Sequence, residues 1–551
     1  FWIDFNRYNF LYDPNRPFPV EVGYEFEPND FAMTYPVALP ADITTEQSNF
    51  DLSTANYQTT PLGYTADIYL TGLDGQRIES ARADMQIVVD ADSLRFVNTF
   101  LHYNLNIDSI YVNGKTVDYH RRNDFKFVGL ILPEYAKKGD TLTVTYWYDG
   151  KNYDYPLPYV DNRIPVEHSF TFHVQKGYNY IMPGMGEISK DGKFEKFQVE
   201  LQQLYKTFYY QGMATNFDTI SFTSDLGIPI NIIKSKAITK QIECYVPDAI
   251  YDSSIISAFN FMTGKVGAPI GTFNINVYPA GFTSMPGMVQ VPQVLCYEPG
   301  YTNALGGFNI FTGHSMAKQW FGNLMQTKTE RENWLEYAAP EYLSLMFIQS
   351  LDEKAFYSNL ALRRDSLEKY DSHNMLRPIY LGKRAKDINL TNKGAWLMHM
   401  LRILMVDLET GSPDNFNKFF HRLCLLTNNK IFTNEDIVNL AEQYYGEDLD
   451  WFFNQWVFDY KIPHFDVTYS VQSGGDKHFV DMNIQTSKAG DEFIYPVVFS
   501  FSSADGNTVL KREIITKETT SIKFGPFDFE PKNVVFNELF SVLCSENVKK
   551  K

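Results

Sequence analysis

Stretches in which apolar and polar residues alternate fill much of the chain between residues 63 and 238. Alternation with a period of two places one side of a strand in a core and the other side in solvent. The clearest stretches are residues 65–73, 83–90, 99–107 and 141–148. Asn113-Gly114 and Asp149-Gly150 follow apolar strand residues and predict tight turns. We therefore predict an antiparallel β domain over residues 63–238.

Near residue 240 the pattern becomes mixed, and longer helical spacings follow. Residues 245–250, 253–262 and 274–279 predict a strand, a helix and a strand. Helices are predicted over residues 313–325, 334–350, 354–370, 390–409, 414–427, 434–445 and 448–460. These elements predict a mixed α/β-helical domain over residues 239–461.

Two details of these helices are specific enough to test. In the amphipathic helix 354–370, the charged residues expected on the solvent side are Arg363, Arg364, Glu368 and Lys369. The spacing of Thr433 and Asp436 predicts a capping box at the start of the helix 434–445.

Both ends of the chain differ from this middle part. After residue 462 alternation returns over 464–471, 479–486, 493–501 and 509–515, which predicts a small β-sandwich over residues 462–551. Residues 1–62 are rich in Phe, Tyr, Pro and Asn, which disfavours helices and central strands but also argues against disorder. We predict an extended lead there, packed on a neighbouring domain or a partner. The fold class is therefore α+β multidomain.

Charge and composition narrow the range of partners. The net charge of −17 repels nucleic acid and anionic lipid, so we exclude both as partners. The most apolar helical run, residues 395–406, is too short to span a bilayer and contains His399 and Arg402. We expect membrane association only through a partner or through a segment that precedes Phe1. The four cysteines are far apart and form no C-x-x-C motif, which indicates neither a metal knuckle nor a dense disulfide framework.

One stretch carries a chemical pattern: residues 313–323 read GHSMAKQWFGN, and residues 334–342 read WLEYAAPEY. With Lys393-Gly394, this stretch resembles the core of the zinc aminopeptidases of the aminopeptidase N type. In that family a helix carries H-E-x-x-H before QWFGN, and the next helix opens with WLNEGFA. Two His one helical turn apart and a Glu after eighteen further residues hold the zinc, while the Glu beside the first His activates water. The resemblance implies an N-terminal β saddle domain, a thermolysin-like domain and a C-terminal β-sandwich.

The residues that carry the chemistry in that family are replaced in this chain. His314 stands at the first ligand position, but Ser315 stands where the family has the base. Lys318 replaces the second His, and Tyr337 replaces the Glu ligand. Zinc binds neutral imidazole, thiolate or carboxylate, and an ammonium group repels it. We therefore predict that the chain holds no metal or other cofactor and has no catalytic residue at these vestigial positions.

A shift of the register is the alternative. Glu336 and Glu341 flank the Tyr that replaces the Glu ligand, and either carboxylate could approach His314. Such a shift gives two ligands at most, beside a Lys.

Two other family positions have also lost their polar groups. The family has G-A-M-E-N on an edge strand of the substrate groove, and its Glu binds the free amino group of the peptide. Here residues 287–290 are Gly287, Met288, Val289 and Gln290, which keep no carboxylate. The family also has Y-x-K-G, where the Tyr stabilises an oxyanion; Thr391 takes that place, and its hydroxyl is too short to reach.

These losses predict a pseudo-aminopeptidase. Our first hypothesis is a catalytically inactive binding or scaffold subunit of a larger assembly, which contacts other protein subunits or an extended peptide laid along a groove near residues 285–297. By analogy with bacterial relatives of this family, we favour a periplasmic or cell-surface location, in the bacterial envelope, over the cytoplasm.

Two other hypotheses remain open. A hydrolase with replaced chemistry would use an atypical metal site or Ser315 and Lys318, which form an S-x-x-K pair on one helical face. Alternatively, His314, Lys318 and Tyr337 bind an anionic ligand in the former cleft. Against that ligand site stands a filled pocket, in which Tyr337 contacts Lys318 and Glu341 lies nearby.

Overall fold

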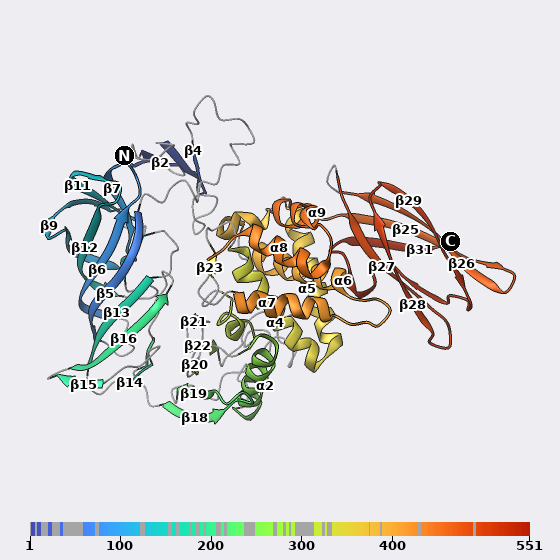
Figure 1. Cartoon of the computed structure of the whole chain (residues 1–551), viewed down its shortest axis with the longest axis horizontal. Coiled ribbons are helices and arrows are strands. Elements are labelled where there is room, and N and C mark those ends of the chain that lie inside the picture. The colour runs from blue at the N-terminus through green and yellow to red at the C-terminus, as the bar shows by residue number, and fades with distance from the viewer. Residues whose placement is uncertain are drawn as a thin grey trace.

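The structure of the chain is a computed structural model. It describes residues 2–5, 8–12, 20–24, 33–36, 59–71, 77–121, 127–151, 157–160, 166–175, 179–181, 188–191, 194–204, 211–213, 217–235, 248–267, 273–278, 283–285, 288–292, 313–321, 326–327, 333–373, 375–385, 388–426, 431–488 and 492–551. An N-terminal region of sheets, a helical region and a C-terminal region of sheets follow one another along the longest axis of the molecule (Figure 1).

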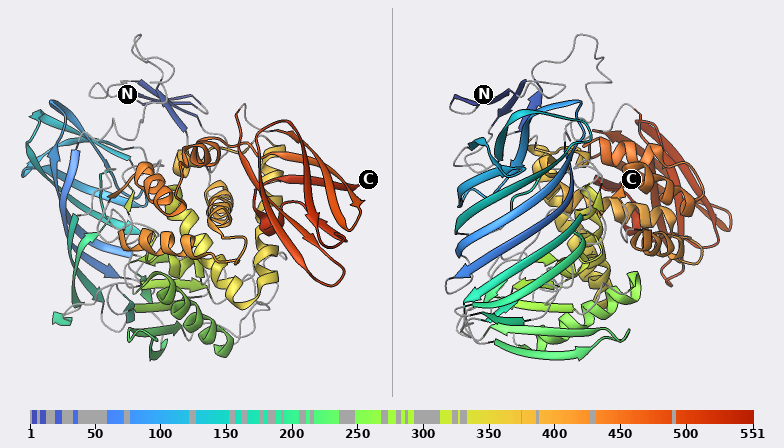
Figure 2. Two further views of the ribbon diagram at one scale, coloured as in Figure 1. Left: turned by 45° about the vertical axis from the view of Figure 1, so that its right-hand side comes forward. Right: turned by 60° about the vertical axis from the view of Figure 1, so that its left-hand side comes forward.

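An eight-stranded sheet dominates the N-terminal region, in the spatial order β15-β16-β13-β5-β6-β12-β8-β9 (Figure 2). Its strands are β5 (Thr59–Thr71), β6 (Arg77–Val89), β8 (Leu105–Val112), β9 (Lys115–Thr116), β12 (Thr141–Lys151), β13 (Val166–Gln175), β15 (Ile188–Asp191) and β16 (Phe194–Leu204). The sheet is mixed rather than purely antiparallel, because β13 runs parallel to β5. The predicted turn at Asn113-Gly114 is confirmed, since it joins β8 to β9.

A three-stranded sheet, β10-β11-β7, shares the apolar core of the large sheet. It consists of β7 (Ser93–Phe100), β10 (Asp118–Arg121) and β11 (Phe127–Lys137). Alternation explains this core, because the inward residues Ile68, Met85, Val97 and Val144 are fully buried while their chain neighbours face outward.

Two predictions in this region are wrong. The single strand predicted over residues 99–107 is two strands, β7 and β8, because the chain turns between them. Arg121 holds that turn: its Nη2 donates to the carbonyl of His102 at 2.6 Å. Asp149-Gly150 is not a turn but part of β12, whose register against β6 shifts between Tyr148 and Gly150. Gly150 is required there because a Cβ would lie 2.5 Å from the carbonyl oxygen of Asn104.

The remaining N-terminal strands are short. Within the lead, four strands pair in the order β1-β2-β3-β4, so these described parts form an antiparallel sheet. Their bounds are β1 (Trp2–Phe5), β2 (Tyr8–Tyr12), β3 (Val20–Tyr24) and β4 (Met33–Pro36), and a further pair is β14 (Asn179–Ile181) with β17 (Gln211–Met213).

The middle of the chain begins with a five-stranded sheet in the order β18-β19-β20-β22-β21. Its strands are β18 (Phe217–Thr223), β19 (Pro229–Ser235), β20 (Phe273–Tyr278), β21 (Thr283–Met285) and β22 (Met288–Pro292). The helix α2 (Asp248–Val266) lies between β19 and β20 in the chain. The helix predicted over 253–262 is therefore confirmed and longer than predicted, whereas the strand predicted over 245–250 is wrong at residues 248–250, which are helical.

Helices make up most of the rest of the middle region. They are α4 (Trp334–Leu351), α5 (Glu353–Ser372), η1 (Ile379–Ala385), the π-helical turn η2 (Asn389–Lys393), α6 (Gly394–Met405), α7 (Asp414–Leu426), α8 (Asn434–Tyr445), α9 (Asp450–Phe453) and η3 (Asn454–Phe458); two short strands, β23 (Gln326–Thr327) and β24 (Ile431–Phe432), also pair. The capping box of α8 is confirmed: Thr433 Oγ1 accepts from the amide of Asp436, and Asp436 accepts from the amide of Thr433.

Three helices are shorter than predicted, and one of them, predicted over 448–460, is helical over residues 450–458. The helix predicted over 313–325 is helical only over residues 313–317, because the amides of Gln319 and Trp320 donate three residues back and tighten the turn. Residues 322–325 lie outside the described residues. The helix predicted to reach residue 409 ends at Met405, and Arg512 of the C-terminal region donates to the carbonyls of Ile403 and Val406 at this end.

The C-terminal region consists of two facing sheets, β29-β26-β25-β31 and β28-β27-β30. The strands are β25 (His464–Gly474), β26 (Lys477–Ser487), β27 (Tyr495–Ser502), β28 (Thr508–Ile515), β29 (Thr519–Phe527), β30 (Asn533–Val535) and β31 (Ser545–Lys550), with the short helix η4 (Glu538–Phe540). All four predicted strands are confirmed. Phe524 of one sheet packs on Phe499 and Phe501 of the other, with ring centres 4.8 and 4.7 Å apart.

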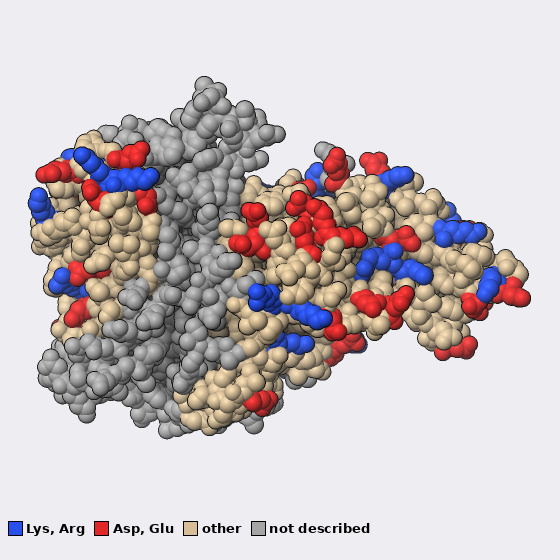
Figure 3. Space-filling view, in the orientation of Figure 1, with Lys and Arg blue, Asp and Glu red and all other residues tan. Residues whose placement is uncertain are grey.

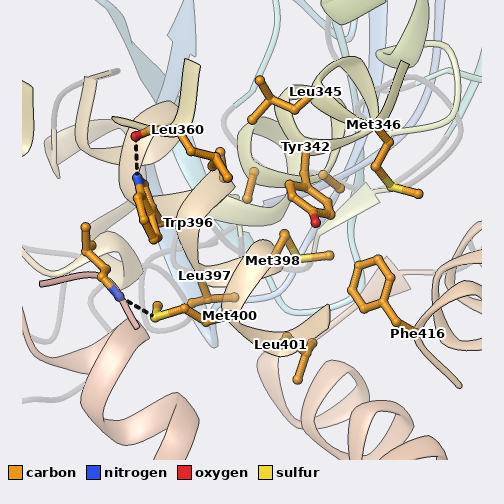
Figure 4. Packing of buried hydrophobic residues seen from close by; sticks show 14 of the residues in the cluster. Tyr342, Leu345, Met346, Leu360, Trp396, Leu397, Met398, Met400, Leu401 and Phe416 are labelled. Atoms are coloured by element: carbon orange, nitrogen blue, oxygen red, sulfur yellow. Dashed lines mark hydrogen bonds between the residues drawn. The ribbon is translucent and has the colours of Figure 1, made fainter. Parts of the chain in front are cut away.

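The helical region and the C-terminal sheets share one continuous apolar core, whereas the N-terminal sheets have a core of their own. In the shared core, the indole of Trp396 on α6 donates to the carbonyl of Leu360 on α5 at 3.0 Å, and the amide of Leu543 contacts Met400 (Figure 4). In the part of the chain that the structure describes, we find no helix with the length and apolarity needed to cross a membrane.

Candidate functional site

His314 is joined to two other helices by a chain of polar contacts. Its Nδ1 lies 2.7 Å from Oε2 of Glu341 on α4. The other carboxylate oxygen, Oε1, accepts a hydrogen bond from Nη2 of Arg363 on α5. Arg363 also donates through Nη1 to the carbonyl of Asn359, one helical turn earlier, at 3.1 Å. We call His314, Glu341 and Arg363 the His314 cluster.

Burial and the neighbouring polar groups together determine the charges of this cluster. The side chains of Glu341 and Arg363 are 9% and 6% exposed, and that of His314 is 19% exposed. Burial alone raises the pKa of Glu341, but Arg363 and His314 outweigh it and lower the pKa to about 2. Burial lowers the pKa of His314, although the hydrogen bond to Glu341 works in the opposite direction. At neutral pH His314 is therefore uncharged, with its proton on Nδ1 facing an ionised Glu341.

The pair of His314 and Glu341 resembles a feature of metal sites, in which a His that binds the metal donates its other ring N–H to a carboxylate. In this chain Glu341 is the supporting carboxylate. Both of its oxygens are engaged, one by His314 and one by Arg363, so Glu341 approaches His314 as a hydrogen-bond partner and not as a second ligand. The prediction that Arg363 faces solvent is wrong, because its guanidinium is the buried counter-charge of Glu341.

Lys318 lies where a second metal ligand would be. Its amide donates to the carbonyl of His314 at 3.2 Å, so the two side chains start one helical turn apart. Its ammonium lies 5.5 Å from the ring centre of the half-buried Tyr337. The contact that the filled-pocket hypothesis expects between Lys318 and Tyr337 is therefore present. The described residues contain no group of three His, Cys, Asp or Glu side chains placed to hold a metal ion.

Ser315 is buried, with 2% of its surface exposed. Within the described structure, the Ser315 hydroxyl forms no hydrogen bond with Lys318 or with any other residue. A nucleophilic serine needs a base within hydrogen-bond reach. The structure does not place Ser315 and Lys318 in such a pair.

Thr391 belongs to the π-helical turn η2, which leads directly into α6. Lys393, at the end of that turn, is fully buried and donates from Nζ to the carbonyl of Asp459. Burial lowers the pKa of Lys393 to about 7, with Asp459 opposing the shift. A Cβ on Gly394 would lie 2.6 Å from the Cβ of Ala338, so glycine is required where α6 crosses α4. In this chain, both matching letters of the Lys-Gly pair have packing roles.

The groove remnant Met288, Val289 and Gln290 lies on β22, and Gly287 lies outside the described residues. β22 is not at the edge of its sheet, as the resemblance implied, because β20 pairs with one side of it and β21 with the other. Val289 is fully buried. An extended peptide therefore has no open strand edge at residues 288–290.

Sequence reasoning missed the role of Arg363, and identified Glu341 only as a possible ligand. The sequence does contain one signal for this role: Asn359 and Arg363 are four residues apart, which places both on one side of α5. The spacing alone does not show whether that side faces the core or the solvent.

The fold is aminopeptidase-like, as a likeness to a solved structure shows. The chain is similar to the crystal structure of Legionella pneumophila aminopeptidase A in complex with aspartic acid, with a TM-score of 0.66 over 90% of this chain and 13% sequence identity. This chain spans 60% of the length of that protein. The likeness shows the fold alone. No protein-family model matches the chain. No curated protein matches it in sequence.

Proposed function

We propose that the chain is a catalytically inactive aminopeptidase-like protein that serves as a binding or scaffold subunit for other proteins. The observation that carries the proposal is the engagement of Glu341. Its two oxygens are taken by a neutral His and a buried Arg, while Lys318 points its ammonium at Tyr337.

The chemistry of zinc supports this reading. A catalytic zinc site takes three protein ligands and leaves one position for water. Here His314 is the one residue of the set that is a suitable ligand, and the positive charge of Lys318 opposes a divalent cation nearby. A protein with this fold and without its chemistry retains large surfaces for contacts with partners.

The test is zinc content by elemental analysis after zinc exposure. We expect essentially no zinc on the natural chain. The variant Ser315→Glu/Lys318→His/Tyr337→Glu, which restores the family's residues, should take up about one zinc per chain. Adding His314→Ala to this variant should abolish the uptake.

The opposite result is equally informative. About one zinc per natural chain, lost in His314→Ala and accompanied by hydrolysis of aminoacyl substrates, would overturn the proposal. Glu336 would then be the first candidate for a further zinc ligand.

A further inference from the structure

A groove of about 320 Å³ lies where the end of α2, the second half of α4 and α7 meet. None of its lining residues belongs to the His314 cluster. The apolar side chains in its lining are Met346 and Phe420, which are 6% and 2% exposed. The other lining residues are Gly264, Lys265, Asp414, Asn417, Lys418 and His421.

The exposed side of α7 continues this groove along the surface. Lys418, His421, Arg422 and Leu425 are exposed and follow one another at the spacing of one helical face, and Leu425 is 52% exposed. The opposite side of α7 is buried in the core, so α7 is fixed in orientation. We call the four exposed residues the α7 stripe.

This surface is basic, whereas the chain as a whole is acidic. The whole protein carries −17, yet basic side chains gather over α7 and the end of α2 (Figure 3). Lys265, Lys418 and Arg422 are exposed, and Asp414 is the one acidic residue that lines the groove. His421 ties the two helices together, since its Nδ1 lies 3.1 Å from the carbonyl of Lys265. The positive rim is thus held in one geometry across both helices.

We propose that this groove and the α7 stripe bind an acidic segment of a partner protein. An apolar side chain of that segment packs on Met346 and Phe420, and its carboxylates lie against Lys265, Lys418 and Arg422. Complementary charge gives the encounter its rate and specificity, and the apolar anchor adds to the affinity. This inference rests on the proposed function as a binding subunit and names the surface and the chemistry of its partner.

The experiment uses the full chain and a fluorescein-labelled peptide that repeats Glu-Glu-Leu. Fluorescence anisotropy measures its affinity for the natural chain and for the variant Lys265→Glu/Lys418→Glu/Arg422→Glu. The matched control is Lys115→Glu/Lys138→Glu/Lys151→Glu, which changes three exposed lysines of the N-terminal region and gives the same net charge. We expect the α7 variant to bind about tenfold more weakly or worse, and the control variant to bind close to the natural chain.

Two further measurements separate this site from general attraction of anions. A peptide with Ser in place of Leu should bind several-fold more weakly, because the apolar anchor is missing. A single-stranded oligonucleotide of equal charge should bind weakly to all three proteins. Equal losses in both triple variants, or equal binding of the oligonucleotide, overturn the proposal, as does a natural chain that does not bind the peptide.

Failure here is distinguishable from failure of the proposed function. Zinc uptake by the natural chain would overturn the latter and says nothing of α7. A natural chain that takes up no zinc and does not bind the peptide overturns the proposal for this surface alone. If the triple variant unfolds, as judged by circular dichroism, the conservative variant Lys418→Gln gives the same comparison with a smaller expected loss.

Discussion

The His314 cluster and the contacts between α6 and its surroundings both bury polar groups, but they satisfy them differently. In the His314 cluster, side chains neutralise one another: a carboxylate lies between an imidazole and a guanidinium. Around α6, side chains donate to backbone carbonyls instead. We call this second set the α6 junction (Lys393, His399 and Arg512).

The α6 junction connects separate parts of the shared core. Lys393 donates to the carbonyl of Asp459, His399 through Nε2 to the carbonyl of Leu539 at 2.8 Å, and Arg512 to the carbonyl of Ile403. Burial lowers the pKa of His399 to about 3, so the ring is neutral, and its Nδ1 can accept from the hydroxyl of Tyr342.

The difference teaches how each site fails when one partner is removed. Loss of Glu341 or Arg363 leaves the other as a buried charge without its counter-charge, which is costly. Loss of a donor at the α6 junction leaves a carbonyl unpaired, which costs less. For Lys393 this cost is offset, because the buried ammonium is removed as well. The cluster is therefore the more sensitive of the two, although we propose that it performs no catalysis.

The largest effect is expected for Glu341→Ala, which removes the counter-charge of buried Arg363. We expect the free energy of unfolding to fall by about 3–5 kcal/mol in urea denaturation. The control is Glu336→Ala on the same helix, where the side chain is half-exposed and the loss should stay below about 1 kcal/mol. Similar small losses in both variants would show that Glu341 and Arg363 do not depend on each other.

A smaller effect with a distinctive pH dependence is expected for Lys393→Met. The folded-state pKa of Lys393 is about 7, below its ordinary value of 10.5, so the unfolded chain binds more protons between these pH values. The natural chain therefore gains stability from this group as pH rises from 7 to about 10. At pH 7 Lys393 still lowers the free energy of unfolding, because its ammonium form is less favourable in the folded chain than in the unfolded chain. The Met variant lacks the titrating group.

At pH 7 we expect Lys393→Met to be more stable than the natural chain by about 2 kcal/mol, after allowing for the lost hydrogen bond. The advantage should shrink toward pH 10, as measured by urea denaturation at several pH values. A difference that stays constant with pH would mean that Lys393 keeps its charge throughout this range.

The smallest effect is expected for Arg512→Ala, which removes the donors at the C-terminal end of α6. We expect a loss of about 1–2 kcal/mol in the free energy of unfolding. Proteolysis should also become faster after Val406, where the helix ends. Lys511→Ala, next to it on β28 and exposed, is the matched control and should change neither quantity. Equal effects in the two variants would assign no role to Arg512 at this helix end.

The C-terminal strands could be predicted from the sequence because alternation is a local signal. Phe465 on β25 and Val480 on β26 alternate with more exposed residues, and these strands appear where that pattern is found. The break between β7 and β8 could not be predicted in this way, since Arg121 holds it from a distant strand. The same holds for the end of α6, which Arg512 binds from more than a hundred residues away.

The sequence predicted the residues of the candidate site and the contact between Lys318 and Tyr337, but not the buried ion pair of Glu341 and Arg363. His314, Lys318 and Tyr337 are found by aligning a motif with the sequence. The burial of Arg363 is not found in this way, because α5 also has charged residues that are at least partly exposed, such as Arg364 and Lys369. Only the packing of α4 against α5 shows which of these cations is the buried partner of Glu341. The domain boundaries, the location in the bacterial envelope and the loss of catalysis stay predictions.

The tight crossing at Gly394 has a consequence for protein engineering. Because Gly394 on α6 lies against Ala338 with no space for another carbon, α4 and α6 are closely packed at the position next to Tyr337. A new side chain placed at position 337 would therefore stand on a closely packed helix, as precise placement of functional groups requires. The fold is thus a ready-made template for installing metal-binding or other reactive side chains, whatever chemistry its natural sequence performs.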